Sequence, residues 1–152
     1  MRETAFYLKE KKGFTMIEVI AVLLLIGIIS TVAISRYSST NPFKLLKETE
    51  TFKGHLRHAR VRSMGDSVSW GLNISSGSYF LEKNGSIASF NLPGENSPTH
   101  NFSDGVTVAA GAGSVVSFDE WGSPGAVDIT IVMVLGTETR TIMVSQNTGA
   151  IQ

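Results

Sequence analysis

The feature that most constrains this 152-residue chain is an apolar run over residues 14–34. The run is interrupted only by small or polar positions: Thr15, Glu18, Gly27, Ser30 and Thr31. At about 1.5 Å per residue, a helix of this length spans about 30 Å, the thickness of the hydrocarbon core of a bilayer. The run therefore predicts a transmembrane helix. The lysines just before it predict that the rest of the chain lies outside the cytoplasm, because a positive flank is retained on the cytoplasmic side: Lys9, Lys11 and Lys12.

One carboxylate, Glu18, lies inside this run. An ionised glutamate inside a membrane helix costs on the order of 3 kcal/mol unless it reaches the headgroups or finds a partner. Glu18 could simply extend toward the headgroups. Alternatively, if the chain were cut between Gly13 and Phe14, the new amino group of Phe14 in an adjacent, axially shifted copy would be a partner cation.

Residues 11–18 read Lys-Lys-Gly-Phe-Thr-Met-Ile-Glu and, with the apolar run, resemble the prepilin signal of type IV pilins and type II secretion pseudopilins. In that family a membrane aspartyl peptidase cuts after the glycine and N-methylates the new terminal residue. The glutamate then guides assembly into a helical filament. The resemblance implies cleavage between Gly13 and Phe14, N-methylation of Phe14, and an assembly role for Glu18.

The resemblance also implies partners and a location. The partners are other pilins or pseudopilins, the prepilin peptidase and the inner-membrane assembly platform. The protein is expected in the bacterial inner membrane as a single-pass protein with its carboxyl-terminal body in the periplasm, and then in a pilus or pseudopilus. Many family members carry a proline near the position of Ser35. Here the nearest helix breaker is Pro42, preceded by Asn41, so the break is expected later than usual.

Four regions follow from this pattern: a leader peptide at 1–13, a transmembrane and assembly helix at 14–34, an amphipathic helical arm at 35–64, and an extracytoplasmic β-rich body at 65–152. In the arm, side chains suited to burial recur every three or four residues and form one stripe: Leu45, Thr49, Phe52, Leu56, Ala59 and Ser63.

Cations lie beside that stripe and form a candidate contact surface: Lys53, Arg57, Arg60 and Arg62. Such a face is most often simply solvated, although it could also meet an acidic neighbouring subunit, the anionic membrane surface or nucleic acid. His55 and His58 lie between the cations and are interpreted as surface residues. No acidic residue or cysteine completes a metal site with them.

The body alternates with the period of β-strands. A meander of three strands is predicted first, at 68–74, at 79–83 and, after a hairpin turn at Asn84 and Gly85, through Ile87 and Phe90. Further strands are predicted at 106–109, 114–118, 127–135 and 139–144. The proline-containing segment 91–104 is predicted to be a loop. The fold class is therefore α+β, with a long amino-terminal helix packed on a carboxyl-terminal antiparallel β-sheet body.

The body resembles, more loosely, the GspH/FimT branch of minor pilins and pseudopilins. The matching stretches are His-Ala-Arg at 58–60, Phe-Asp-Glu-Trp-Gly at 118–122, Arg-Thr-Ile-Met-Val at 140–144 and Thr-Gly-Ala-Ile at 148–151. The resemblance implies a structural subunit.

No catalytic, cofactor or metal pattern emerges from the sequence, so the chain is predicted not to be an enzyme. Asp119 and Glu120 are adjacent, and their side chains would point to opposite faces of a strand, so they are interpreted as a polar turn. Two alternatives remain open: a DNA-binding minor pilin for DNA uptake, and a membrane-anchored periplasmic protein without a filament role.

Overall fold

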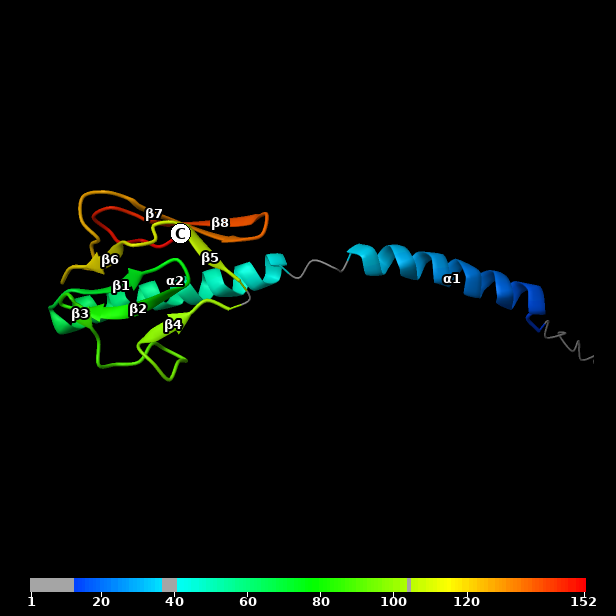
Figure 1. The fold of residues 1–152 in the computed structure, drawn as a ribbon, viewed down its shortest axis with the longest axis horizontal. Coiled ribbons are helices and arrows are strands. Elements are labelled where there is room, and N and C mark those ends of the chain that lie inside the picture. Colours follow the sequence, from blue (N-terminus) through cyan, green and yellow to red (C-terminus); the bar gives the residue numbers. More distant parts are fainter. Residues whose placement is uncertain (1–12, 37–40, 104) are drawn as a thin grey trace, which may run out of the picture. The chain divides into compact units, whose positions relative to one another are not determined.

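The structure is a computed structural model that describes residues 13–36, 41–103 and 105–152. The chain divides into two compact units, with the boundary after residue 39, and each is described by itself. The first contains helix α1 (Met16–Arg36), and the second contains helix α2 (Asn41–Asp66) and all the described strands (Figure 1).

Helix α1 begins after Thr15, whose hydroxyl oxygen accepts a hydrogen bond from the backbone N–H of Glu18 at 3.3 Å. The polar side chains further along are satisfied by the helix itself. Ser30 donates to the carbonyl of Ile26 at 2.7 Å, and Thr31 donates to the carbonyl of Gly27 at 3.0 Å. Within the part of the chain that the structure describes, no helix is long and apolar enough to cross a membrane. The transmembrane role of residues 14–34 stays a prediction.

Helix α1 continues past Ser35, and α2 begins at Asn41, with Pro42 in its first turn. Proline is well tolerated there, because the N–H that it lacks would have had no partner within the helix. Residues 37–40, between the two helices, lie outside the described residues. The predicted stripe of α2 is confirmed, since all six of its side chains are buried, and Glu48 and His55 are buried beside them.

The described strands form two antiparallel sheets. In the first, β2 (Ser78–Lys83) pairs with β1, β3 and β4, and β1 pairs further with β6: β1 Trp70–Ile74, β3 Ser86–Ile87, β4 Thr99–Asn101 and β6 Val115–Phe118. The second sheet has three strands, β5 (Thr107–Ala110), β7 (Ile129–Leu135) and β8 (Glu138–Val144), and β7 lies between β5 and β8. The α+β architecture predicted from the sequence is confirmed.

The predicted hairpin turn is present, with positive φ at Asn84 (50°) and Gly85 (78°), as a two-residue hairpin requires. The prediction that residues 91–104 are a loop is wrong in part, because β4 lies within this segment and pairs with β2. Tyr79 of β2 is opposite His100 of β4. Strand β4 has no alternating apolar residues, so its extended backbone is stabilised by pairing with β2 and could not be predicted from its own sequence.

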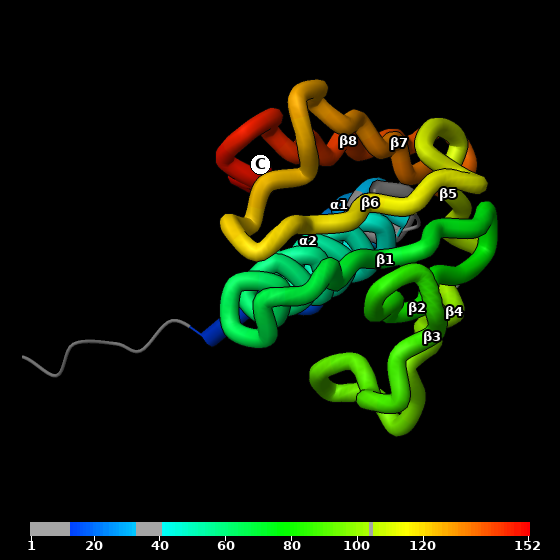
Figure 2. Tube along the Cα trace, turned by 90° about the vertical axis from the view of Figure 1, so that its left-hand side faces the viewer, coloured from blue at the N-terminus to red at the C-terminus, as the bar shows by residue number. Residues whose placement is uncertain are grey.

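Helix α2 contacts strands of both sheets, and in Figure 1 it runs between the β7–β8 hairpin and strands β1 and β2. Figure 2, turned by 90°, shows the strands curving around the helix. The buried face of α2 therefore forms the centre of the core. Phe52 contacts Tyr79 edge to face, with ring centroids 4.9 Å apart, and Trp70 and Phe118 are fully buried.

Candidate functional site

The predicted processing site lies just before the first turn of α1. Gly13, Phe14 and Thr15 precede the helix, and the Phe14 side chain is 82% exposed. Glu18 is exposed in the first helical turn, where a carboxylate interacts favourably with the positive end of the helix dipole. Thr15 and Glu18 also have the spacing of a capping box. The capping interaction is a second, local reason for a glutamate at this position.

Phe14 and Glu18 line one hollow of about 270 Å³ on the side of α1, together with three aliphatic residues one turn apart: Val19, Val22 and Leu23. The structure therefore brings two of the predicted site residues together, while Gly13 lies outside the lining. The surface of the hollow is apolar. Such a surface suits an apolar group.

The four cations predicted as a contact surface have different surroundings. Lys53 forms an ion pair with Glu50 at 3.3 Å, and Arg60 donates from Nε to the carbonyl of Gly122 at 3.2 Å. The Arg62 guanidinium lies over two aromatic rings, 5.5 Å from the centroid of Trp70 and 5.1 Å from that of Phe90. Arg57 is exposed. The structure therefore does not present the four cations as one uniform solvated face.

The prediction that His55 and His58 are surface residues is wrong. His55 is buried, and its ring contacts the hydroxyl of Tyr79 at 2.7 Å and the carbonyl of Pro93 at 3.0 Å. His58 is half-buried, and its Nε2 has no hydrogen-bond partner among the described residues. Burial lowers the pKa of both imidazoles. The charge of Arg62 lowers the pKa of His58 further.

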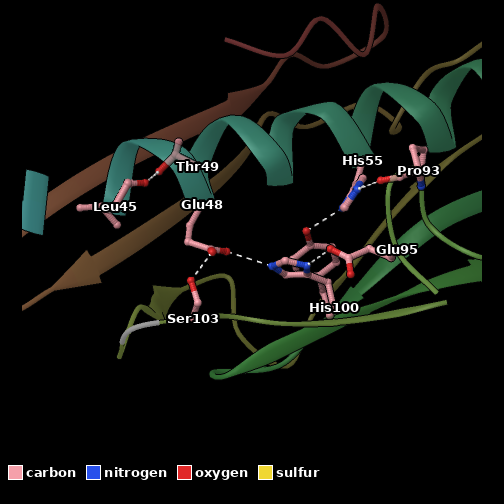
Figure 3. A network of polar contacts seen from close by, with 9 residues as sticks. Leu45, Glu48, Thr49, His55, Pro93, Glu95, His100 and Ser103 are labelled. Carbon is pink, nitrogen blue, oxygen red and sulfur yellow. Dashed lines mark hydrogen bonds and ion pairs between the residues drawn. The ribbon is translucent and has the colours of Figure 1, made fainter. Parts of the chain in front are cut away.

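A buried polar cluster next to His55, on the same side of α2, was missed from the sequence (Figure 3). Glu48 is its centre: Oε1 accepts a hydrogen bond from Ser103 at 2.5 Å, and Oε2 lies 2.9 Å from Nε2 of His100. Nδ1 of His100 lies 2.6 Å from Oε1 of Glu95. A signal was present, because Glu48 and His55 follow Leu45 and Phe52 by three residues and widen the buried stripe.

Among the described residues, no group of three histidine, cysteine or acidic side chains could hold a metal ion. The predicted polar turn at Asp119 is present. Its Oδ1 accepts hydrogen bonds from the backbone N–H groups of Trp121 at 2.9 Å and Ser123 at 2.8 Å. This carboxylate therefore shapes a turn that leaves Trp121 exposed.

Two comparisons with known proteins bear on these features. The family described as the prokaryotic N-terminal methylation motif matches residues 8–34, which include the predicted processing site and most of α1. Among curated protein sequences, none matches this chain significantly.

The fold is similar to a crystal structure of the type IV minor pilin FimU of Pseudomonas aeruginosa, with a TM-score of 0.54 and 17% sequence identity. The match covers 74% of this chain and 90% of that one. At this identity the similarity concerns the fold. The motif match concerns residues 8–34, and the structural match shows a pilin-like α+β fold.

Neither similarity is to an enzyme, in agreement with the prediction that the chain is not one. The motif match at residues 8–34 is in line with the expected partners, other pilus subunits and the prepilin peptidase, and with the expected location in the inner membrane and then the pilus.

Proposed function

We propose that this chain is a minor pilin or pseudopilin of the GspH/FimT branch, incorporated into a type IV pilus or a type II secretion pseudopilus after cleavage between Gly13 and Phe14. The observation that carries the proposal is the start of α1: Phe14 and Glu18 line one hollow at the head of an apolar helix. The match to the methylation motif over the same residues supports it.

In the proposed assembly step, Glu18 accepts the N-methylated amino group of Phe14 from an adjacent, axially shifted copy. The hollow beside Glu18 is lined by aliphatic side chains, so water is largely excluded once a neighbouring helix covers it. A charge pair is stronger where water is excluded. A misplaced neighbour leaves the carboxylate buried without a partner, which is costly, so the pair fixes the axial register between helices.

The first experiment is amino-terminal mass spectrometry of the protein purified from its native membranes. We expect a mature chain that begins with N-methylated Phe14. A Gly13→Leu variant is the control and should keep the mobility of the uncleaved precursor. An uncut amino terminus in the unaltered protein would favour a membrane-anchored protein without a filament role.

The second experiment replaces the assembly carboxylate. Glu18→Ala should leave cleavage intact and lower incorporation into filaments by about tenfold or more, because a buried amine without its partner is costly. Glu138→Ala is a matched control that removes an exposed carboxylate at the start of β8. Recovery of Glu18→Ala in sheared filaments at the level of Glu138→Ala would contradict the pairing.

DNA binding through the basic residues of α2 is the weaker candidate. Arg60 and Arg62 are engaged by the body itself, and Lys53 is paired with Glu50, which leaves Arg57 as the exposed cation of the four. Binding that neutralises several phosphates would weaken steeply with salt. A titration of duplex DNA at two salt concentrations tests this candidate.

A further inference from the structure

The segment from Pro93 to Ser103 is fastened to α2 by titratable side chains. From the helix come Glu48 and His55, and from the segment come a carbonyl oxygen, a hydroxyl and two ionisable side chains: Pro93, Ser103, Glu95 and His100 (Figure 3). The segment is also attached to the body by the β4 ladder, by the buried Leu92 and by the ring contacts of Phe102 with Phe52 and Tyr79. Backbone hydrogen bonds from Leu81 to the carbonyl of Pro98 and from Phe102 to the carbonyl of Gly77 hold it as well. The protonation of these groups therefore bears on how firmly the segment is held.

His100 needs a proton on both ring nitrogens. Nδ1 faces a carboxylate oxygen of Glu95 at 2.6 Å, and Nε2 faces one of Glu48 at 2.9 Å. Ionised carboxylates only accept hydrogen bonds, and a neutral imidazole has a single N–H. The other oxygen of Glu48 accepts the hydrogen bond from Ser103, and the Glu95 side chain is 33% exposed. The geometry therefore requires an imidazolium between two carboxylates.

His55 needs the opposite state. Its Nε2 contacts the carbonyl of Pro93, which can only accept, so Nε2 carries the proton. Its Nδ1 then accepts from the hydroxyl of Tyr79. Burial lowers the pKa of His55, and the positive charge of His100 lowers it further, while the Pro93 carbonyl, Glu95 and Glu48 act in the other direction. Burial also raises the pKa of Tyr79, so its hydroxyl stays a donor.

We propose that His55 and His100, held in opposite protonation states with ring centroids 5.9 Å apart, form a latch that fastens residues 93–103 to α2 only within a window of pH. Above the window, His100 loses a proton and one ring nitrogen turns its lone pair toward a carboxylate. Below the window, His55 gains a proton and Tyr79 loses its acceptor. Either change leaves a buried polar group without a partner, which is costly.

The surroundings of the two rings hold few other charges. The ionisable groups that interact with them are Glu48 and His58 of α2, Tyr79 of β2 and Glu95 of the segment, and Tyr79 stacks on His100 with centroids 5.0 Å apart. Phe102 contacts the ring of His100, and Phe52 contacts Tyr79 and Phe102. Since the β4 ladder remains, opening of the latch loosens the segment locally and leaves the core intact.

The protonation states are tested directly by nitrogen NMR of the imidazole rings in the full chain, in detergent micelles. The chain has three histidines, and single His→Gln variants assign their signals. At the pH where the amides of residues 93–103 are best protected from hydrogen exchange, we expect two protonated nitrogens on His100. At the same pH we expect a neutral His55 with its proton on Nε2. A neutral His100 or a charged His55 at that pH overturns the proposal, and this measurement does not depend on any variant being stable.

The latch itself is tested by amide hydrogen exchange of residues 93–103 between about pH 5 and about pH 9, a range that spans histidine titration. Protection, corrected for intrinsic exchange, should fall by about tenfold or more on each side of its maximum. His100→Gln should remove the alkaline fall and keep the acid one. His58→Gln is the matched control and should keep both. A flat profile in the unaltered chain, or an alkaline fall that survives in His100→Gln, overturns the proposal.

Discussion

The two helices of this protein differ in how far their apolar side chains are buried. The large apolar side chains described from Phe14 onward in the α1 unit are between 47% and 84% exposed, whereas the stripe of α2 is buried by the two sheets. A helix that is apolar on every side needs a lipid or protein environment, while an amphipathic helix finds its partner in its own domain. Helix α2 therefore contributes to the stability of the body, whereas the apolar surface of α1 is suited to partners outside the body.

The largest expected effect comes from truncating the centre of the α2 stripe. Phe52→Ala should lower the free energy of unfolding of the body by about 3–5 kcal/mol, because it leaves a cavity against Tyr79 and Phe102. Leu24→Ala in α1 removes a similar apolar side chain from an exposed position and should leave that value unchanged within about 0.5 kcal/mol. Denaturant unfolding of the full chain in micelles, followed by the fluorescence of buried Trp70, measures both. Equal losses of unfolding free energy in the two variants would contradict the different roles of α1 and α2.

A smaller effect is expected from adding a methyl group. A Cβ at Gly71 would lie 2.3 Å from the carbonyl oxygen of Val116 across the β1–β6 pair, so Gly71→Ala should cost about 1–3 kcal/mol through overpacking. Nothing lies within 4 Å of a Cβ at Gly54 of α2 or Gly27 of α1. In the same unfolding measurement, Gly54→Ala should stabilise the body by about 1 kcal/mol through helix propensity, and Gly27→Ala should not change it. If Gly71→Ala leaves the free energy of unfolding unchanged, strands β1 and β6 can move apart at little cost.

The smallest effect is a pH dependence of the stability of the body. The lowered pKa values of His55 and His58 mean that the unfolded chain binds more protons than the folded chain below about pH 6.5. Their contribution to the free energy of unfolding is therefore fully present above that pH and is lost as the pH falls toward the folded-state values. His58→Gln should reduce the loss measured between about pH 6.5 and pH 5. An unchanged acid slope would contradict the prediction.

The strands predicted from alternation are the ones whose own residues create a buried face. Leu72 and Ile74 in β1, and Ile131 and Met133 in β7, point into the core at every second position. Strand β4 could not be predicted in this way, since Thr99, His100 and Asn101 are polar and the strand is stabilised by β2. Sequence patterns thus predicted the strands that have an apolar face of their own. They missed β4, whose extended backbone depends on pairing with β2.

The candidate sites divide along the same line. Phe14 and Glu18 are four residues apart on one helix, so a local pattern suffices to predict both. The buried polar cluster joins Glu48 to His100 and Ser103, residues more than fifty positions later, and no local pattern encodes such a contact. His55 was misassigned for the same reason, because its partners Tyr79 and Pro93 come from distant segments.

The peptide bond between Gly13 and Phe14 lies outside the helical hydrogen bonds of α1, which begins at Met16. A protease binds its substrate as an extended strand, and a bond inside a helix must first be unwound. Under the proposed processing, the leader can therefore be removed without melting a single turn. The Thr15 cap also remains on the mature chain, so the helix start that presents Glu18 is the same before and after cleavage.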